Sequence, residues 1–235
     1  MSQIAIMQPY FLPYIGYFQL MNTVDTFVVY DNIQYTKKGW INRNRFLLNE
    51  TDQYFTIQIK KASDFFTIKE RYLVDNFKIS NEKQLRKIEN AYKKAPFFNE
   101  VIPVVSNCFL HQDNRLFNFI LHSLIEIKNH LDISTKIVIS STIENNTTDL
   151  HGVERVKNIC KLLSTDKYIN PIGGLDLYNK SDFKKDNIQL NFIQTKLMDY
   201  TQFNNPHIPF LSIIDVLMFN GKTKTKALLN DFTLI

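Results

Sequence analysis

Cationic and aromatic side chains gather in one short segment, residues 37–45. These side chains are Lys37, Lys38, Trp40, Arg43 and Arg45. An arginine binds phosphate or carboxylate through paired hydrogen bonds, and an indole offers a flat face to a base or sugar ring. The segment therefore predicts a site for an anionic ligand that carries a ring, with Asn42 orienting it by hydrogen bonds. The alternative is a solvated hairpin in which Trp40 belongs to the core.

Polar residues follow two apolar runs that predict strands, residues 4–7 and 26–30. Gln8 follows the first run and Asp31 follows the second. Open α/β sheets bind ligands at the carboxyl ends of their strands, so both side chains are candidates for a binding site. Gln8 would orient a substrate, while Asp31 would take a proton, hold a sugar hydroxyl or pair with Arg43.

The segment after the first predicted strand resembles a phosphate-binding motif. Nucleotidyltransferases and class I synthetases carry His-x-Gly-His at such a helix start, where this chain has Tyr14-Ile15-Gly16-Tyr17. Their second motif resembles Ser140-Ser141-Thr142, which follows a later strand. Tyrosines replace both histidines and no arginine follows the serines, so phosphate charge would be stabilised less well. The alternatives are helix–strand packing for Gly16 and a turn or cap for Ser140 and Ser141.

Three further residues are candidates for binding or proton transfer. Gly173 and Gly174 would let a ligand approach backbone N–H groups, with a flexible turn as the alternative. His151, near Arg155 at a predicted helix start, would act as a base, with a surface histidine as the alternative. The five histidines are scattered and no His-Glu-x-x-His motif is present, so no metal site is expected. The glycine-rich motifs of common ATPases and dinucleotide-binding enzymes are absent from the sequence.

The composition is that of an ordinary globular chain. Of 235 residues, 44% are hydrophobic, the formal net charge is +5 and the isoelectric point is near 9.0. Basic residues are spread along the sequence, which favours small acidic ligands over a dedicated nucleic-acid surface, with plain solvation as the equal alternative. Cys108 and Cys160 predict buried, reduced thiols. No signal peptide or membrane-spanning run is evident, so a soluble cytoplasmic protein without membrane insertion is expected.

Hydrophobic periodicity predicts an α/β chain of one domain, residues 1–235, with a helical insertion at residues 75–131. A strand–helix–strand unit opens the chain, so the sheet should be mostly parallel and Rossmann-like, of the nucleotidyltransferase-like type. Strands are predicted at residues 4–7, 26–30, 136–139, 167–170 and 188–193, with a hairpin of 46–48 and 54–59. Helices are predicted at residues 13–21, 81–94, 97–110, 114–131, 149–163 and 212–220. Predicted helix caps are Ser80, Thr148 or Asp149, and a capping box of Ser212 with Asp215.

Four stretches of the chain together resemble the WbqC-like family. They are residues 6–18 (IMQPYFLPYIGYF), 25–35 (DTFVVYDNIQY), 40–44 (WINRN) and 210–217 with Asn220-Gly221. The resemblance runs over essentially the whole chain. Tyr10 and Gln34 fall within these stretches and join the candidate substrate-binding residues. Many members have histidine where this chain has Met7, so a proton-transfer or phosphate-binding role at that position is not expected here.

Members of that family occur among enzymes that build O-antigens of lipopolysaccharide and other surface glycans. The association implies a transferase of amino-sugar biosynthesis that moves an acyl or aminoacyl group to the amine of a nucleotide-linked sugar. On this interpretation residues 37–45 neutralise a pyrophosphate, Trp40 or Tyr17 stacks on a ring, and Asp31 or His151 deprotonates the amine.

The acyl donor stays open among a thioester of coenzyme A or of an acyl-carrier protein, an aminoacyl-tRNA and an adenylate, and no cofactor is assigned. Two alternatives to acyl transfer remain. The first is ATP-dependent nucleotidyl transfer or ligase-type activation. The second is a non-catalytic binding module for a phosphorylated metabolite or nucleic acid.

Overall fold

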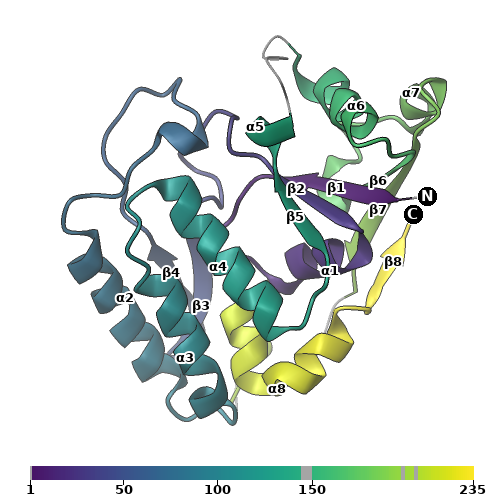
Figure 1. Cartoon of the computed structure of the whole chain (residues 1–235). Helices are drawn as coiled ribbons and strands as arrows, with labels where there is room; N and C mark the ends of the chain where they lie inside the picture. Colours follow the sequence, from purple (N-terminus) through teal and green to yellow (C-terminus); the bar gives the residue numbers. More distant parts are fainter. Residues whose placement is uncertain (1, 144–149, 197–198, 204–205) are drawn as a thin grey trace.

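A six-stranded sheet forms the centre of the computed structural model, which describes residues 2–143, 150–196, 199–203 and 206–235 (Figure 1). Its strand order is β5-β2-β1-β6-β7-β8, and all neighbours are parallel except the antiparallel pair β7 and β8. The strands are β1 Gln3–Met7, β2 Thr26–Val29, β5 Lys136–Ile139, β6 Lys167–Pro171, β7 Gln189–Thr195 and β8 Phe232–Leu234. The predicted α/β fold with a mostly parallel sheet is confirmed.

The strand order reverses direction beside β1. The chain passes from β1 through α1 (Ile15–Thr23) to β2 and later to β5, all on one side of β1. It then returns through α6 (Gly152–Leu162) and places β6 on the other side. Crossovers that diverge in this way leave a crevice at the carboxyl ends of the strands. The fold therefore leaves such a crevice next to β1 and β6.

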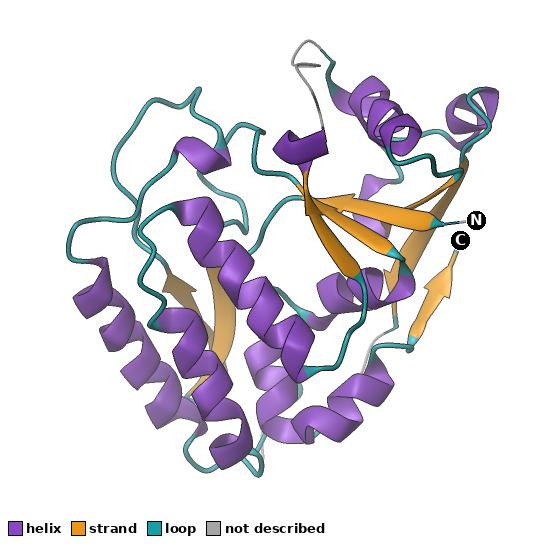
Figure 2. Ribbon diagram, viewed as in Figure 1, coloured by secondary structure: helices purple, strands orange, loops and turns teal. Residues whose placement is uncertain are grey.

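Alternate strand residues face two different hydrophobic cores. Ala5 and Phe27 pack in the core that includes α1 and the helices of residues 77–130. Ile6 and Val28 pack in a second core with α6 and α7 (Lys180–Lys185). Helices therefore cover both faces of the sheet (Figure 2). Because both faces are buried, these strands are short apolar runs without polar alternation.

Three helices and a separate hairpin form the rest of the core. They are α2 Phe77–Tyr92, α3 Phe98–Phe109 and α4 Leu116–His130, with hairpin strands β3 Arg43–Leu48 and β4 Thr51–Thr56. The predicted cap Ser80 is wrong, because α2 begins earlier and includes that residue. The hairpin turns at Asn49 and Glu50, whose φ angles of 49° and 64° match a tight two-residue turn. β4 therefore begins and ends earlier than predicted, and Ile57 and Ile59 lie beyond it.

The last helix, α8 (Ile213–Leu228), agrees with the prediction at its cap and departs from it at two other residues. Its predicted cap is confirmed, because Ile214 N donates to Ser212 Oγ at 3.3 Å. Asp215 does not complete a capping box, since its carboxylate accepts hydrogen bonds from distant parts of the chain. The helix kinks at Gly221, where φ is 64° and ψ is 179°, and continues instead of ending there.

Several short elements were not predicted, because periodicity needs more residues than they contain. They are α5 Ser140–Ile143, α7, β8 and the 3₁₀ turns η1 Ile68–Glu70 and η2 Ile172–Gly174. The cap predicted at Thr148 or Asp149 lies outside the described residues. Within the described part of the chain, no helix is both long and apolar enough to cross a bilayer.

Three buried tyrosines should make the fold sensitive to alkaline pH. Burial raises the pKa of Tyr17, Tyr92 and Tyr168 well above the ordinary value of 10.0. Above a pH of about 10 the unfolded chain releases phenolic protons that the folded chain retains. The free energy of unfolding therefore falls as pH rises through this range. Thermal melts on both sides of pH 10 should show the fall, and phenolate absorbance that rises before unfolding would contradict it.

Candidate functional site

A cavity of about 1150 Å³ opens at the carboxyl ends of the central strands. Gln8 follows β1, Asn32 lies just beyond β2 and Asn170 lies near the end of β6, and all three side chains line the cavity. The cavity thus occupies the crevice that the reversed strand order provides. Its volume is slightly above the range of typical small-molecule sites, about 300–1,000 Å³.

Two helices direct their N-terminal ends at this cavity. Tyr14 is the N-cap of α1 and His151 is the N-cap of α6, and neither of these two side chains makes a capping hydrogen bond to its helix. Gly16 and Gly152, in the first turns, line the cavity together with these caps. Backbone N–H groups of an uncapped first turn, with the helix dipole behind them, attract anions such as phosphate. The cavity is therefore suited to an anionic group.

Tyrosine is the most frequent aromatic residue in the cavity wall. The five tyrosines are Tyr10, Tyr14, Tyr17, Tyr30 and Tyr178. Burial raises the pKa of Tyr10, Tyr14 and Tyr17 above the ordinary value, so these hydroxyls stay neutral donors at physiological pH. The Tyr17 hydroxyl donates to the Gln8 carbonyl at 3.0 Å, which fixes the ring against the loop after β1. Ring faces with neutral hydroxyls suit a ligand that is itself a ring with polar substituents.

Gly16 is required by the position of the Tyr14 ring. A Cβ atom at residue 16 would lie 2.4 Å from the edge of that ring. Any side chain there would push the phenol away from the first turn of α1. Gly16 therefore allows the Tyr14 ring to pack against the first turn of α1.

Charged groups of both signs stand at the cavity wall. The Arg155 guanidinium lies 4.7 Å from the centre of the Tyr30 ring and donates to Asn32 Oδ1 at 2.5 Å. Lys69 and Glu70 line the cavity from η1. Hydrogen bonds from Thr67 lower the pKa of Glu70, so this group remains an anion. Arg155 is therefore held in place on the wall as a fixed positive charge.

The structure brings together about half of the sequence-predicted site residues. Those that line the cavity are Gln8, Tyr10, Gly16, Tyr17, Gln34, His151, Gly173 and Gly174. Those outside its wall are Asp31, Lys37, Lys38, Trp40, Asn42, Arg43, Arg45, Ser140 and Ser141.

Asp31 is buried in a network with the two serines. Its carboxylate accepts hydrogen bonds from Ser140 Oγ at 2.9 Å, Ser141 N at 3.0 Å and Ser141 Oγ at 2.6 Å. Both carboxylate oxygens are thereby engaged at the start of α5. The alternative pairing of Asp31 with Arg43 is wrong. The network ties the end of β2 to the end of β5 beside the cavity.

The cations of residues 37–45 make their contacts within the hairpin and its neighbours. Arg43 donates to the carbonyl oxygens of Gly39 at 3.1 Å and Lys38 at 2.6 Å. Trp40 is 42% exposed and stacks on Tyr54 with ring centres 6.2 Å apart, so the alternative that placed it in the core is wrong. The remaining contacts are ion pairs of Lys37 with Asp64 and of Arg45 with Asp52, and bonds of the Asn42 side chain to Tyr35 and Ile57.

Other cavity residues were not among the sequence candidates. The most informative are Tyr30, Asn32, Arg155, Asn170 and Tyr178. Three of them stand at strand ends, a signal that identified Gln8 and Asp31 and applies equally to their neighbours. Arg155 lies one helical turn after His151, so the helix period would place both on one face.

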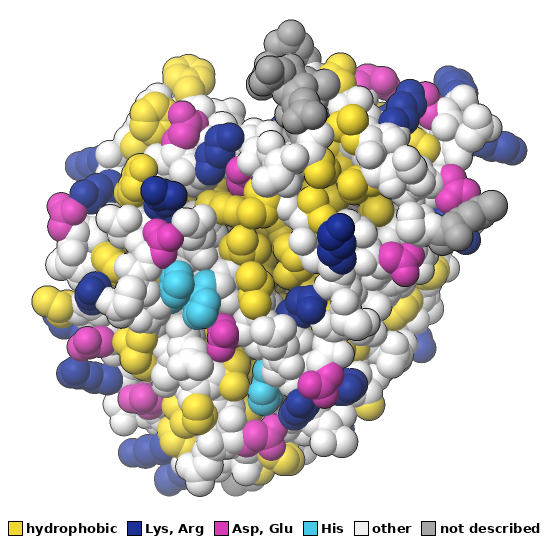
Figure 3. Space-filling view, in the orientation of Figure 1, with side chains coloured by type: hydrophobic (Ala, Val, Ile, Leu, Met, Phe, Trp, Pro, Cys, Tyr) yellow, Lys and Arg dark blue, Asp and Glu magenta, His cyan; other side chains and the backbone are white. Residues whose placement is uncertain are grey.

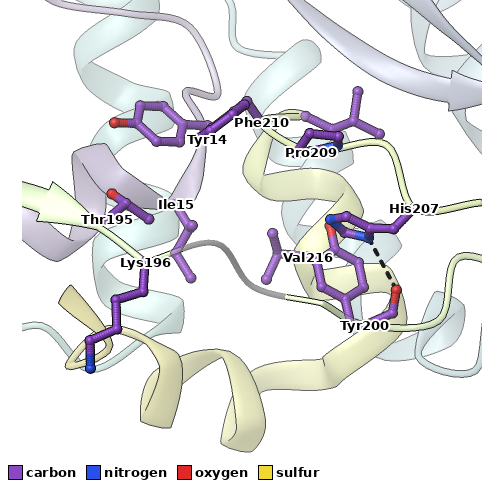
Figure 4. A pocket seen from close by; sticks show the side chains of 10 residues that line it. Tyr14, Ile15, Thr195, Lys196, Tyr200, His207, Pro209, Phe210 and Val216 are labelled. Atoms are coloured by element: carbon purple, nitrogen blue, oxygen red, sulfur yellow. Dashed lines mark hydrogen bonds between the residues drawn. The ribbon is translucent and has the colours of Figure 1, made fainter. Parts of the chain in front are cut away.

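Tyr14 also lines a second, much smaller cavity of about 20 Å³ (Figure 4). That volume holds about one water molecule. His207 faces it, and His207 Nδ1 lies 3.2 Å from the Tyr200 carbonyl oxygen. Within the described residues, no group of three or more histidine, cysteine or acidic side chains is arranged to hold a metal ion. The larger cavity is therefore the candidate site.

Comparison with known proteins finds sequence similarity over nearly the whole chain. The chain is 28% identical over 222 residues to the uncharacterized protein Rv1507c of Mycobacterium tuberculosis, and the match covers 94% of each chain. No solved structure matches the chain. The sequence pattern of the WbqC-like protein family matches residues 8–227, which include every cavity residue named above from Gln8 onward. The chain belongs to the WbqC-like protein family.

Proposed function

We propose that the chain is a cytoplasmic transferase that moves an acyl or aminoacyl group to the amine of a nucleotide-linked sugar. The observation that carries this proposal is the composition of one cavity wall. Two uncapped helix N-termini and Arg155 offer positive potential, and five tyrosines offer ring faces and neutral hydroxyls. A nucleotide-linked sugar matches both the positive potential and the ring faces, because it joins two ring systems through a pyrophosphate.

Each group in the wall then has a role. The N-termini of α1 and α6, with Arg155, hold the pyrophosphate. The tyrosines pack against the base and the sugar, and Gln8 and Asn170 bind sugar hydroxyls. His151 is exposed at the cavity wall and takes the proton of the amine as nitrogen attacks the acyl carbonyl. The bond from the acyl carbon to the donor breaks, and the leaving group is the thiol of a thioester or the tRNA hydroxyl, which takes up that proton, or AMP from an adenylate. Asp31 positions the loop after β2, because its oxygens are already engaged.

Nucleotidyl transfer from ATP is the second candidate. Gly16 and the rings of Tyr14 and Tyr17 stand at the start of α1 beside β1, where nucleotidyltransferases bind phosphates. The hydroxyls of Ser140 and Ser141 donate to Asp31, which leaves them committed within the protein. Acyl transfer therefore accounts for more of the wall.

Ligand-induced thermal stabilisation separates the candidates. A uridine or thymidine diphosphate amino sugar should raise the melting temperature on its own, and product should form when an acyl thioester is added. Stabilisation by ATP with Mg²⁺ and none by nucleotide-linked sugars would refute the proposal in favour of nucleotidyl transfer. Binding without product with thioester, adenylate or aminoacyl-tRNA would identify a binding module.

Arg155 should decide the affinity for the nucleotide-linked sugar. Arg155→Ala should weaken binding by about 1.5–3 kcal/mol, the range for a charged hydrogen bond. Isothermal titration measures the change, after melting confirms that the variant folds without its contact to Asn32. Lys38→Ala is the matched control, since it removes a cation outside the cavity wall. Equal affinity in both variants would remove Arg155 from the site.

A further inference from the structure

A loop at the cavity mouth presents two phenylalanines to solvent. Phe65 is 86% exposed, the highest value among the large hydrophobic side chains in the described part of the chain, and Phe66 is 41% exposed. The loop comprises residues 60–69. Its last residues include Thr67 and Lys69, which line the cavity. Exposed apolar rings next to a functional cavity mark an interaction surface.

Hydrogen bonds hold the tip of this loop in place. Phe66 N donates to the Ser63 carbonyl at 3.2 Å, and the buried Arg71 donates to the same oxygen at 2.6 Å. Gln34 Nε2 donates to the Asp64 carbonyl at 2.8 Å, and Tyr35 N donates to the Phe66 carbonyl at 3.1 Å. The two rings therefore project from an anchored turn rather than from a loose segment.

The loop and the segments next to it, residues 34–38 and 60–71, together hold most of the positive charge surplus of the chain. Residues 34–38 and 60–71 contain six basic and two acidic side chains, a surplus of four out of five for the whole chain. Lys37 pairs with Asp64 and Lys60 pairs with Asp75, both at the surface. The described residues contain no ion pair for the other three lysines, Lys38, Lys61 and Lys69. Figure 3 shows hydrophobic side chains flanked by basic ones at this upper left edge of the molecule.

We infer that the 60–69 loop is a peripheral membrane contact that docks the molecule on an anionic lipid surface. Phenylalanine side chains enter the boundary between headgroups and acyl chains, and lysines beside them are attracted to anionic lipids. The tip is a protruding pair of rings without polar atoms, which suits an apolar medium better than base stacking in a groove. Docking in this way places the mouth of the cavity at the lipid surface.

Vesicle co-sedimentation of the full chain tests this contact. The chain should sediment with vesicles of phosphatidylcholine containing phosphatidylglycerol, and much less with phosphatidylcholine alone. The double variant Phe65→Ser with Phe66→Ser should lower the affinity for the mixed vesicles about tenfold or more, because both rings lose their apolar burial. Lys61→Glu with Lys69→Glu should lower it as well, and raised salt should reduce wild-type binding.

Leu162→Ser is the matched control, because Leu162 is 47% exposed on α6 rather than on the loop. It should bind vesicles like the wild type, and all variants should keep the wild-type melting temperature. Equal vesicle binding by the double phenylalanine variant and the wild type would overturn the inference. Failure of the wild type to bind anionic vesicles would also overturn it. The loop would then have another role, which would appear as dimerisation or as binding of single-stranded RNA in a gel-shift assay.

Discussion

Replacing Asp215 with alanine should lower the free energy of unfolding by about 3 kcal/mol or more, because three hydrogen-bond donors lose the acceptor that they share. The carboxylate is fully buried and accepts hydrogen bonds from the Tyr92 hydroxyl at 2.8 Å, the Tyr200 hydroxyl at 2.6 Å and Gln202 Nε2 at 2.7 Å. Alanine would leave all three donors buried without their acceptor, and each such donor costs about 1–3 kcal/mol. Chemical denaturation measures the loss.

The network matters because it joins three segments that are far apart in sequence. Tyr92 ends α2 and its hydroxyl also accepts from Leu47 N at 2.8 Å, so the carboxylate is linked through it to β3. The Asp215 side chain is fully buried, and burial raises the pKa of its carboxyl group. Asp176→Ala is the control, because it removes an exposed carboxylate and should leave stability unchanged. A loss of less than about 1 kcal/mol in Asp215→Ala would contradict the proposed weight of the network.

Replacing Gly221 with alanine should lower the free energy of unfolding by about 2–5 kcal/mol, through two separate effects. The φ of 64° with ψ of 179° is a conformation that only glycine adopts readily. A Cβ atom there would also lie 2.5 Å from the Phe97 ring, which packs against the kink of α8. The ring would have to move before the side chain could fit.

Two other glycines separate these effects in the same denaturation assay. Gly152 has a φ of 52° but no atom within 4 Å of a built Cβ, so Gly152→Ala should show the backbone cost alone. Gly173 has open space and no positive φ, so Gly173→Ala should change stability little. Phe97→Leu should restore part of the loss in Gly221→Ala. If Gly221→Ala and Gly173→Ala were equally stable, neither strain nor overlap would operate at the kink.

The order of the elements could be predicted because it depends on local pattern. Apolar runs at residues 4–7 and 26–30 predicted the first two strands, since strands covered on both faces carry no polar alternation. The apolar residues at helical spacing in residues 114–131 predicted α4, because such a pattern forms one buried face of a helix. Ends were less accurate, as at Ser80 and Gly221, because a cap or kink depends on packing against other parts of the chain.

The location of the cavity could also be predicted from the sequence, but most of the residues in its wall could not. Strand ends in an α/β chain converge at one edge of a sheet, and this rule identified Gln8, while Gly16 and His151 were identified from predicted helix starts. The rule does not say which loop folds over that edge. Residues 37–45 concentrate charge in the sequence, yet their arginines are used inside the hairpin, while Arg155 from α6 supplies the charge in the wall.

The sequence by itself determined the α/β class, the family and the edge of the sheet at which the cavity opens. Only the tertiary structure decided the partners of the buried polar groups. Asp31 meets Ser140 across 109 residues, and Asp215 meets Tyr92 across 123 residues. Such pairings follow from how helices and strands pack around one core, whereas residue types and local periodicity report only which side chains will be buried. For that reason residues 14–17 could be recognised as a helix start from the sequence. The cavity wall around them, with its five tyrosines and the N-termini of α1 and α6, could not be predicted.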